Sequence, residues 1–193
     1  MAKGIRLIVG LGNPGSSYAE TRHNAGFRFI EQLVSRTGAT LKSESKFSGH
    51  AGKVTIAGND VWLLKPDTYM NNSGESVAAA ARFYKVDPDE ILVVHDELDL
   101  SPGAVRLKVG GGHGGHNGLR DIMPKLGSKE FVRLRVGIGH PGSASQVSSY
   151  VLKKAPNAEQ ELTDEAITRA LGHIEDIVVG DFETVMNDLH THT

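Results

Sequence analysis

The chain of 193 residues contains no cysteine, which excludes disulfide bonds, thiolate metal ligands and a cysteine nucleophile. It also lacks a long apolar run. The apolar stretch from Ile5 to Leu11 is interrupted by Arg6 and Gly10, so it is too short for a membrane span or a signal peptide. We therefore expect a soluble, cytoplasmic protein without membrane contact. There is no internal repeat and no long linker, and the length predicts one domain covering residues 1–193.

Charge is unevenly distributed along the chain. The net charge of −2 alone does not favour binding to nucleic acid. Residues 101–154, however, carry nine basic and two acidic side chains, whereas residues 155–193 carry one basic and nine acidic side chains. This asymmetry predicts a local anion-binding surface next to an acidic C-terminal part. The alternative is a solvated basic surface that is balanced by an acidic helix.

Strand-like and helix-like patterns alternate along the chain. Apolar runs and one hairpin signal predict strands at 5–9, 53–56, 61–64, 91–94, 105–109 and 132–138. In the last of these, apolar and basic residues alternate, which predicts one buried face. The alternation of the two patterns, together with the hairpin, predicts an α/β sandwich with a central mixed, mostly parallel sheet flanked by helices.

Three asparagines mark the expected starts of helices. Asn24 and Asn117 each precede an apolar segment of helical period, and Asn72 is followed by Glu75 as in a reciprocal cap pair. Apolar residues at helical spacing also predict a helical, acidic C-terminal part from about 157 to 190.

Two glycine-rich segments, Gly10–Gly15 and Gly110–Gly115, match the spacing of a dinucleotide-binding loop. The first does not suit this role because Pro14 has no amide hydrogen and no helix follows directly. The second lacks an acidic residue at the end of a following strand. A G-x-x-x-x-G-K-[ST] motif is absent from the sequence. We therefore expect no cofactor.

His23 and Asp96 are the candidate catalytic pair. His23 ends the loop after the first predicted strand, and Asp96 lies two residues beyond the predicted strand at 91–94. If these strands are parallel neighbours, both side chains lie above their carboxyl ends, where α/β folds place ligand sites. A carboxylate bonded to one imidazole nitrogen supports the charge that forms when the other nitrogen accepts a proton. A purely structural His–Asp contact is the alternative.

Loop asparagines Asn13, Asn71 and Asn117 lie beside apparent strand–helix junctions and add amide groups to this pair. An amide both donates and accepts hydrogen bonds, which suits a substrate with peptide or ester carbonyls. Caps and turns also favour asparagine, so each has a structural alternative. Together with His23 and Asp96, these residues suggest a hydrolase that activates water.

Three further histidines, His113, His116 and His140, are candidate zinc ligands. Only His113 and His116 are close in the sequence, and no third ligand follows them at a defined spacing. No residues that would orient the ligands are evident either, so we expect no metal. A metal-dependent hydrolase remains an alternative, and it predicts inhibition by chelators.

Six segments carry long and unusual motifs. They are V-G-L-G-N-P-G at 9–15, T-R-H-N-A-G at 21–26, Y-M-N-N-S-G at 69–74, H-D-E-L-D at 95–99, the glycine-rich stretch at 110–118 and R-V-G-I-G-H-P at 135–141. In this order the segments resemble the bacterial peptidyl-tRNA hydrolase family. The resemblance extends from residue 7 to about residue 152, and beyond residue 155 only the general pattern is similar.

The resemblance implies hydrolysis of the ester that joins a peptide to the 3′-terminal ribose of tRNA, without a metal or another cofactor. It implies that His23 takes a proton from the attacking water and that Asp96 holds His23 in its basic form. It also assigns the asparagines: Asn71 and Asn117 bind the peptide and the terminal nucleotide, and Asn13 distinguishes N-blocked from free aminoacyl esters.

The same resemblance places Tyr18, Tyr69 and Met70 along the path of tRNA and peptide; a core position is the structural alternative for Tyr69. Lys108 and Arg135 match the basic clamp of the family on the tRNA 5′-phosphate, with Arg106 and Arg133 nearby. One departure concerns 143–146, which reads S-A-S-Q where the family often has lysines. This departure predicts a weaker contribution of that loop to tRNA binding.

Peptidyl-tRNA is the implied partner, and we expect a monomer because no exposed apolar seam is evident. The competing hypothesis is an RNA-binding factor that keeps the RNA surface of this fold without the chemistry. The presence of His23, Asp96, Asn71 and Asn117 argues against this hypothesis.

Overall fold

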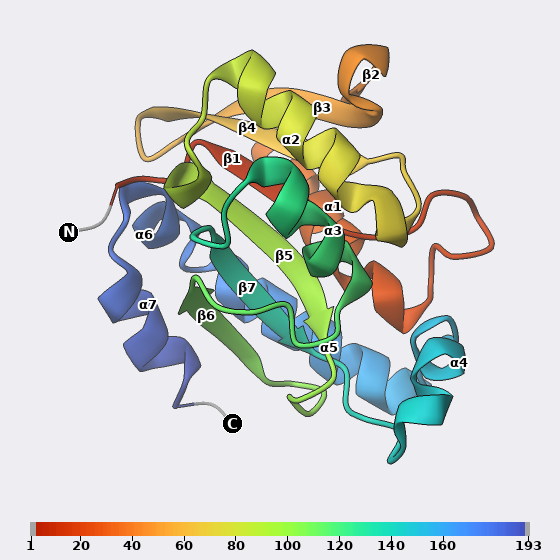
Figure 1. Cartoon of the computed structure of the whole chain (residues 1–193). Helices are drawn as coiled ribbons and strands as arrows, with labels where there is room; N and C mark the ends of the chain where they lie inside the picture. The colour runs from red at the N-terminus through yellow and green to blue at the C-terminus, as the bar shows by residue number, and fades with distance from the viewer. Residues whose placement is uncertain (1–2, 192–193) are drawn as a thin grey trace.

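Seven strands form one sheet at the centre of the structure, a computed structural model that describes residues 3–191 (Figure 1). The strands are β1 (Leu7–Gly10), β2 (Lys42–Glu44), β3 (Gly49–Ile56), β4 (Asn59–Pro66), β5 (Ile91–Glu97), β6 (Val105–Val109) and β7 (Val132–Gly137). Their order across the sheet is β2-β3-β4-β1-β5-β7-β6. The four central strands β4, β1, β5 and β7 are parallel to one another, and the pairs at both edges are antiparallel. The predicted mixed sheet and its hairpin are confirmed.

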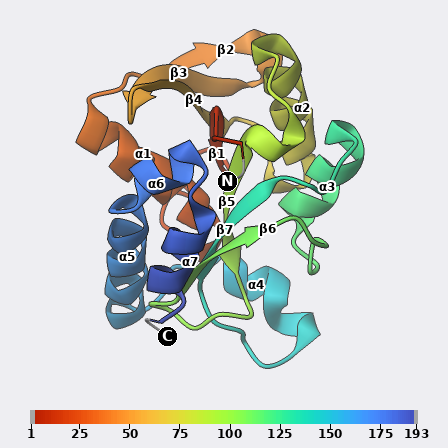
Figure 2. The ribbon, with the colours of Figure 1, turned by 90° about the vertical axis from the view of Figure 1, so that its left-hand side faces the viewer.

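Helices cover both faces of the sheet (Figure 2). They are α1 (Ala25–Thr37), α2 (Ser73–Tyr84), α3 (Asn117–Leu126), α4 (Val147–Val151), α5 (Asn157–Leu171), α6 (Ile174–Val179) and α7 (Phe182–Leu189). Short 3-10 turns are η1 (Arg22–Asn24), η2 (Ser45–Phe47), η3 (Met70–Asn72), η4 (Pro88–Glu90) and η5 (Ala144–Gln146). Helices α1, α5, α6 and α7 pack on one face, and α2 and α3 pack on the other, so each face has its own apolar core. The expected α/β sandwich is confirmed.

The C-terminal part is helical, as the sequence predicts, and its helices are α5, α6 and α7. Gly172 and His173 separate α5 from α6, and Gly180, with a φ of 86°, ends α6. A φ in this region is strained for any residue with a Cβ, so glycine is favoured at this break. Within the described residues, no helix combines the length and the apolarity needed to cross a bilayer.

Asn24 and Asn72 directly precede α1 and α2, as predicted, but in the described part of the chain none of the three asparagine side chains caps a helix. Within the described residues, the side chains of Asn24 and Asn72 make no cap hydrogen bond, because each ends a 3-10 turn. Their backbone angles, φ −95° and ψ 18° for Asn24 and φ −116° and ψ 17° for Asn72, differ from the extended geometry that turns a cap side chain toward the helix. Asn117 is the first residue of α3, and His116 caps this helix instead.

Strand β7 is buried on both faces, which contradicts the single buried face predicted from its alternating pattern. The exception to the pattern is Arg133, which is only 2% exposed. Its guanidinium donates hydrogen bonds to the backbone carbonyls of Gly111, Gly112 and Lys129. These carbonyls replace water as acceptors for the two terminal nitrogens, whereas the buried Nε atom has no hydrogen-bond partner among the described residues.

Helix α1 begins in close contact with the ends of β1 and β5. A Cβ atom at Gly26 would lie 2.4 Å from both the Leu11 nitrogen and the Val94 oxygen. The absence of a side chain there lets the Phe27 amide donate to the Leu11 carbonyl over 3.2 Å. Because η1 directly precedes this contact, Gly26 fixes the height of His23 above the sheet.

We expect Gly26→Ala to destabilise the fold by about 1–3 kcal/mol, because the backbone atoms around the added methyl group have little room to move. For a chain of this length the melting temperature should fall by roughly 3–10 °C. Thermal unfolding followed by circular dichroism measures this change. Gly112→Ala is the control, because a methyl group added at Gly112 would have no described atom within 4 Å. Equal melting temperatures for the two variants would contradict the close contact.

Candidate active site

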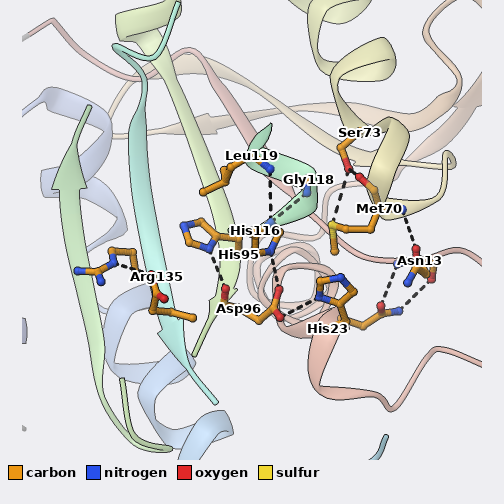
Figure 3. A network of polar contacts seen from close by, with 12 residues as sticks. Asn13, His23, Met70, Ser73, His95, Asp96, His116, Gly118, Leu119 and Arg135 are labelled. Atoms are coloured by element: carbon orange, nitrogen blue, oxygen red, sulfur yellow. Dashed lines mark hydrogen bonds and ion pairs between the residues drawn. The ribbon is translucent and has the colours of Figure 1, made fainter. Parts of the chain in front are cut away.

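His23 and Asp96 meet at the carboxyl edge of the sheet, as expected from the sequence (Figure 3). Strands β1 and β5 are parallel neighbours, with Gly10 paired to Val94, so both chains leave the sheet at the same edge. Asp96 is still within β5, and η1 brings His23 back over the strand ends. The His23 Nδ1 atom lies 2.8 Å from Asp96 Oδ2.

The Asp96 carboxylate is buried, with 3% of the residue exposed. Burial alone would raise its pKa, but the positive charge of protonated His23 and the hydrogen bonds from its histidine partners hold the pKa well below its usual range. For His23, burial opposes the charged form, yet the negative charge of Asp96 and the hydrogen bond to it raise the pKa above its usual value. An ionised Asp96 accepts a hydrogen bond from the Nδ1–H group of His23, so Nε2 of His23 is the basic nitrogen.

His116 is the second histidine on Asp96, a role that the sequence pattern does not predict. Its Nε2 atom lies 2.8 Å from Asp96 Oδ1, and its Nδ1 accepts hydrogen bonds from the amides of Gly118 and Leu119 over 3.1 and 3.3 Å. The cap position before α3 is the signal that could reveal it, but the residue pattern favours Asn117 as the cap. Asp96 is therefore bonded by one histidine on each carboxylate oxygen (Figure 3).

A third histidine, His95, lies behind this pair. It is 2% exposed, and its Nδ1 donates to the Asp96 backbone carbonyl over 2.9 Å. Its ring packs edge-on against the ring of His116, with centroids 5.0 Å apart. Burial, followed by the charge that His116 can carry, lowers the pKa of His95 to about 4. His95 is therefore neutral near pH 7, and its Nδ1–H group binds the backbone carbonyl of Asp96.

The three groups His23, Asp96 and His116 lie close enough for a metal, with potential ligand atoms within 4.8 Å of one another. Their hydrogen bonds do not suit a metal. The lone pair of His116 accepts from the backbone of α3, so its Nε2 carries the proton that faces Asp96. A metal ligand must present a lone pair, and neither histidine nitrogen that faces Asp96 does so.

The other candidate zinc ligands do not join this cluster. His113 and His140 each accept a hydrogen bond on Nδ1 from the amide two residues later, at Gly115 and Gly142. Among residues 3–191, neither lies in a group with metal-ligand geometry. Within the described residues, His113, His116 and His140 therefore do not form one ligand group.

A cavity of about 290 Å³ opens beside His23. It brings together most of the candidate site residues of the sequence, with three residues around α4 as an additional wall. The lining residues are Asn13, Tyr18, His23, Tyr69, Met70, Asn71, Asn117, Ser148, Val151 and Leu152. Tyr69 is 59% exposed, so its alternative assignment to the core is wrong. Tyr18 packs edge-on against Tyr69, with ring centroids 6.2 Å apart.

Asn13 is held in this wall by a pair of hydrogen bonds with the Asn24 side chain. The Asn24 side chain accepts from the Asn13 amide over 2.9 Å and donates to the Asn13 carbonyl over 3.0 Å. This contact is the role that Asn24 has in place of a helix cap. The Asn13 Oδ1 atom accepts from the Met70 amide over 2.7 Å, which joins the loops after β1 and β4. The Nδ2 group of Asn13 is then the part of the amide that can donate to a ligand.

Lys108 and Arg135 lie together in a second cavity of about 230 Å³, which we call the basic cavity. Its lining residues are His95, Glu97, Asp99, Lys108, Gly112, His113, Gly114, Leu119, Arg133 and Arg135. Arg135 forms an ion pair with Glu97 over 2.9 Å. A narrow space of about 60 Å³ shares His23 and Asn117 with the first cavity and Glu97 and Gly114 with the basic cavity, so the cavities adjoin.

Arg106 and Arg133, which the sequence places near Lys108 and Arg135, do not join them as cations that face a ligand. Arg133 is engaged by backbone carbonyls, and Arg106 lines a different cavity between residues 99–104 and α5. That cavity is larger, at about 510 Å³, but the described residues that line it include no histidine. We place the candidate site at the smaller cavity because His23 lines it.

Comparisons with known proteins show to which family this chain belongs. The chain matches the family described as peptidyl-tRNA hydrolase over residues 7–193. It is 57% identical over 190 residues to the peptidyl-tRNA hydrolase of Saccharophagus degradans, covering 98% of this chain and 96% of that protein. It is also 57% identical over 192 residues to that of Teredinibacter turnerae, covering 99% and 100%. The crystal structure of the Acinetobacter baumannii peptidyl-tRNA hydrolase superposes with a TM-score of 0.96 at 55% identity, covering 100% of this chain and 98% of that one.

We expect Asp96→Asn to lower the pKa of His23. In the native protein burial is opposed by the charge of Asp96 and by the hydrogen bond to it, which together outweigh burial, whereas in the variant burial opposes the imidazolium without that charge. Nuclear magnetic resonance titration of the histidine side chains measures the shift. Asp67→Asn is the matched control, because it removes the carboxylate from the His50–Asp67 pair, also at 2.8 Å, and should leave the pKa of His23 unchanged. An unchanged titration of His23 would show that Asp96 does not control its charge.

Proposed function

Because the chain belongs to the peptidyl-tRNA hydrolase family, we propose that it cleaves the ester between a peptide and the 3′-terminal ribose of tRNA with His23 as general base. The observation that carries this proposal is the hydrogen bond from His23 Nδ1 to the buried carboxylate of Asp96, at the edge of a cavity lined by amides. A histidine oriented in this way has a basic nitrogen at the position where a water molecule can be activated.

In the proposed reaction, His23 Nε2 takes a proton from water while the water oxygen attacks the ester carbonyl carbon. The negative charge of Asp96 stabilises the imidazolium that forms. The tetrahedral intermediate then collapses, the bond from carbon to the ribose oxygen breaks, and the imidazolium returns its proton to that oxygen. Free tRNA and a peptide with a C-terminal carboxyl group result, and the histidine is regenerated.

The asparagines supply neutral hydrogen-bonding groups around this reaction. Asn71 and Asn117 lie in the same cavity wall as His23 and can bind the peptide carbonyls and the terminal nucleotide. Asn13 offers only a donor, because its oxygen is bonded to the Met70 amide. An N–H donor can bond to the acyl oxygen of an N-blocked substrate, whereas a free ammonium group would repel it. This difference supports a role of Asn13 in distinguishing N-blocked from free aminoacyl esters.

The remaining wall of the cavity suits the acceptor end of tRNA and an unspecified peptide. Tyr69 presents an exposed ring on which a base or sugar can stack, a contact of about 1–3 kcal/mol. Met70 is buried in this wall, and Leu152, which also lines the cavity, is 43% exposed. Apolar contacts of this kind depend little on the peptide sequence, as needed for an enzyme acting on many peptides.

The basic cavity supports the binding of the tRNA 5′-phosphate. Lys108 and Arg135 both line it, and it adjoins the cavity of His23 through shared residues. Since Glu97 already neutralises part of the charge of Arg135, Lys108 is the stronger candidate for direct contact with a phosphate. Phosphate contacts supply affinity without reading a base sequence.

Release of N-acetyl-aminoacyl groups from tRNA tests the proposal, with unblocked aminoacyl-tRNA and EDTA as controls. Cleavage of the blocked ester alone, unaffected by EDTA, is the expected result. Binding of tRNA without cleavage would instead favour the RNA-binding factor, and inhibition by EDTA would favour a metal-dependent hydrolase.

We expect His23→Ala to reduce turnover by about 10²–10⁴-fold, the usual contribution of a general base. Binding of uncharged tRNA should remain within a factor of a few of the native value, because His23 contributes no charge to the basic cavity. Single-turnover hydrolysis and filter binding measure the two effects. Turnover at the native rate would refute the assignment of the base.

Lys108→Ala should weaken binding of tRNA that carries a 5′-phosphate, and the slope of log affinity against log salt should fall by about one. Lys42→Ala is the matched control, because β2 lies at the opposite edge of the sheet from β6. If the salt slope is the same in both variants, the phosphate is bound elsewhere.

A further inference from the structure

We propose that His116 is a positioning residue that sets the basicity of His23 through the carboxylate they share. This inference rests on the proposed function and extends it to a residue that does not touch the reacting atoms. The observation behind it is the hydrogen bonding of the His116 ring, which contacts the start of α3 with one nitrogen and Asp96 with the other (Figure 3).

The start of α3 determines which nitrogen of His116 carries the proton. The amides of Gly118 and Leu119 both point at Nδ1, so this atom must present its lone pair. A proton on Nδ1 would face two N–H groups and the positive end of the helix. The proton therefore resides on Nε2, from which His116 donates to Asp96 Oδ1 over 2.8 Å.

This donor competes with His23 for the negative charge of Asp96. A hydrogen bond from His116 stabilises the ionised carboxylate and draws charge toward Oδ1, while His23 is bonded to Oδ2. Without His116, the same carboxylate would hold the His23 imidazolium more strongly and raise the pKa of His23 further. His116 thus keeps His23 a base at neutral pH instead of a permanently charged partner of Asp96.

Among the described residues, few other charged or titratable groups lie near Asp96 and could change the pKa of His23. His95 and Glu97 lie on β5 on either side of Asp96, and Glu97 is paired with Arg135 of β7. On η1, the Arg22 guanidinium lies over the ring of Tyr150, 3.8 Å from its centroid. Helix α4 contributes only Ser148, Val147 and Val151 to the lining of the narrow space beside Asp96. Among the described residues, the groups hydrogen-bonded to the Asp96 carboxylate are His23 and His116.

Two substitutions separate the contacts of His116. In His116→Asn, the side-chain oxygen can take the place of Nδ1 and cap α3, but the side chain is too short to donate to Asp96. In His116→Gln, the amide nitrogen can take the place of Nε2 and donate to Asp96, but the cap is lost. The half-exposed His50, paired with Asp67 over the same 2.8 Å, provides the matched control His50→Asn.

The experiment measures the His23 titration by nuclear magnetic resonance and the acidic limb of kcat/KM for N-acetyl-aminoacyl-tRNA in all three variants. We expect His116→Asn to retain a melting temperature near the native value while both pH midpoints rise by about 0.5–1 unit. His116→Gln should instead lose a few degrees of melting temperature and keep the native midpoints. His50→Asn should change neither.

The inference would be overturned if His116→Asn kept the native pH midpoints. It would also be overturned if both His116 variants shifted their pH midpoints in step with their loss of melting temperature. Imidazole ¹⁵N spectra of the native protein provide a direct check, because they must show His116 protonated on Nε2. The spectra and the titration do not depend on catalysis. Absent hydrolysis in the native protein would therefore count against the proposed function alone, whereas a His116 proton on Nδ1 would count against this inference alone.

Discussion

The site depends on one buried charge, the carboxylate of Asp96. A carboxylate with 3% exposure is costly unless hydrogen bonds replace the water it has lost. His23 supplies one bond and His116 supplies the other, each over 2.8 Å. The hydrogen bond from His23 therefore has two effects. It stabilises the buried charge of Asp96, and it orients His23 as the proposed base.

The backbone makes this arrangement possible by bringing three loops to one point. Parallel β1 and β5 end at the same edge, and the contact at Gly26 brings η1 down onto that edge. The bond from the Met70 amide to Asn13 fixes the loop after β4, and the His116 cap fixes the start of α3. Each of these contacts involves a backbone group, so the positions of the functional side chains follow from the fold itself.

Much of the fold and part of the site are predictable from the sequence. Apolar runs at 5–9 and 91–94 predict the buried strands, and the loop residues that follow them identify His23 and Asp96. The roles of His116 and Arg133 are not predictable in this way. His116 caps α3 only because the preceding loop turns through Gly114 and Gly115 at positive φ. The carbonyls of Gly111 and Gly112 that bury Arg133 lie about 20 residues earlier in the chain and face it only after the glycine-rich loop has folded back.

The role of the Asp96 charge in catalysis is tested by hydrolysis of N-acetyl-aminoacyl-tRNA with Asp96→Asn, measured from acidic to alkaline pH. Asparagine preserves the size of the side chain but removes the charge that orients His23 and supports its protonated form. We expect kcat to fall by about 10²-fold or more, with no recovery at alkaline pH. A native rate in this variant would contradict the proposed mechanism, because the charge of Asp96 would then have no part in the activity of His23.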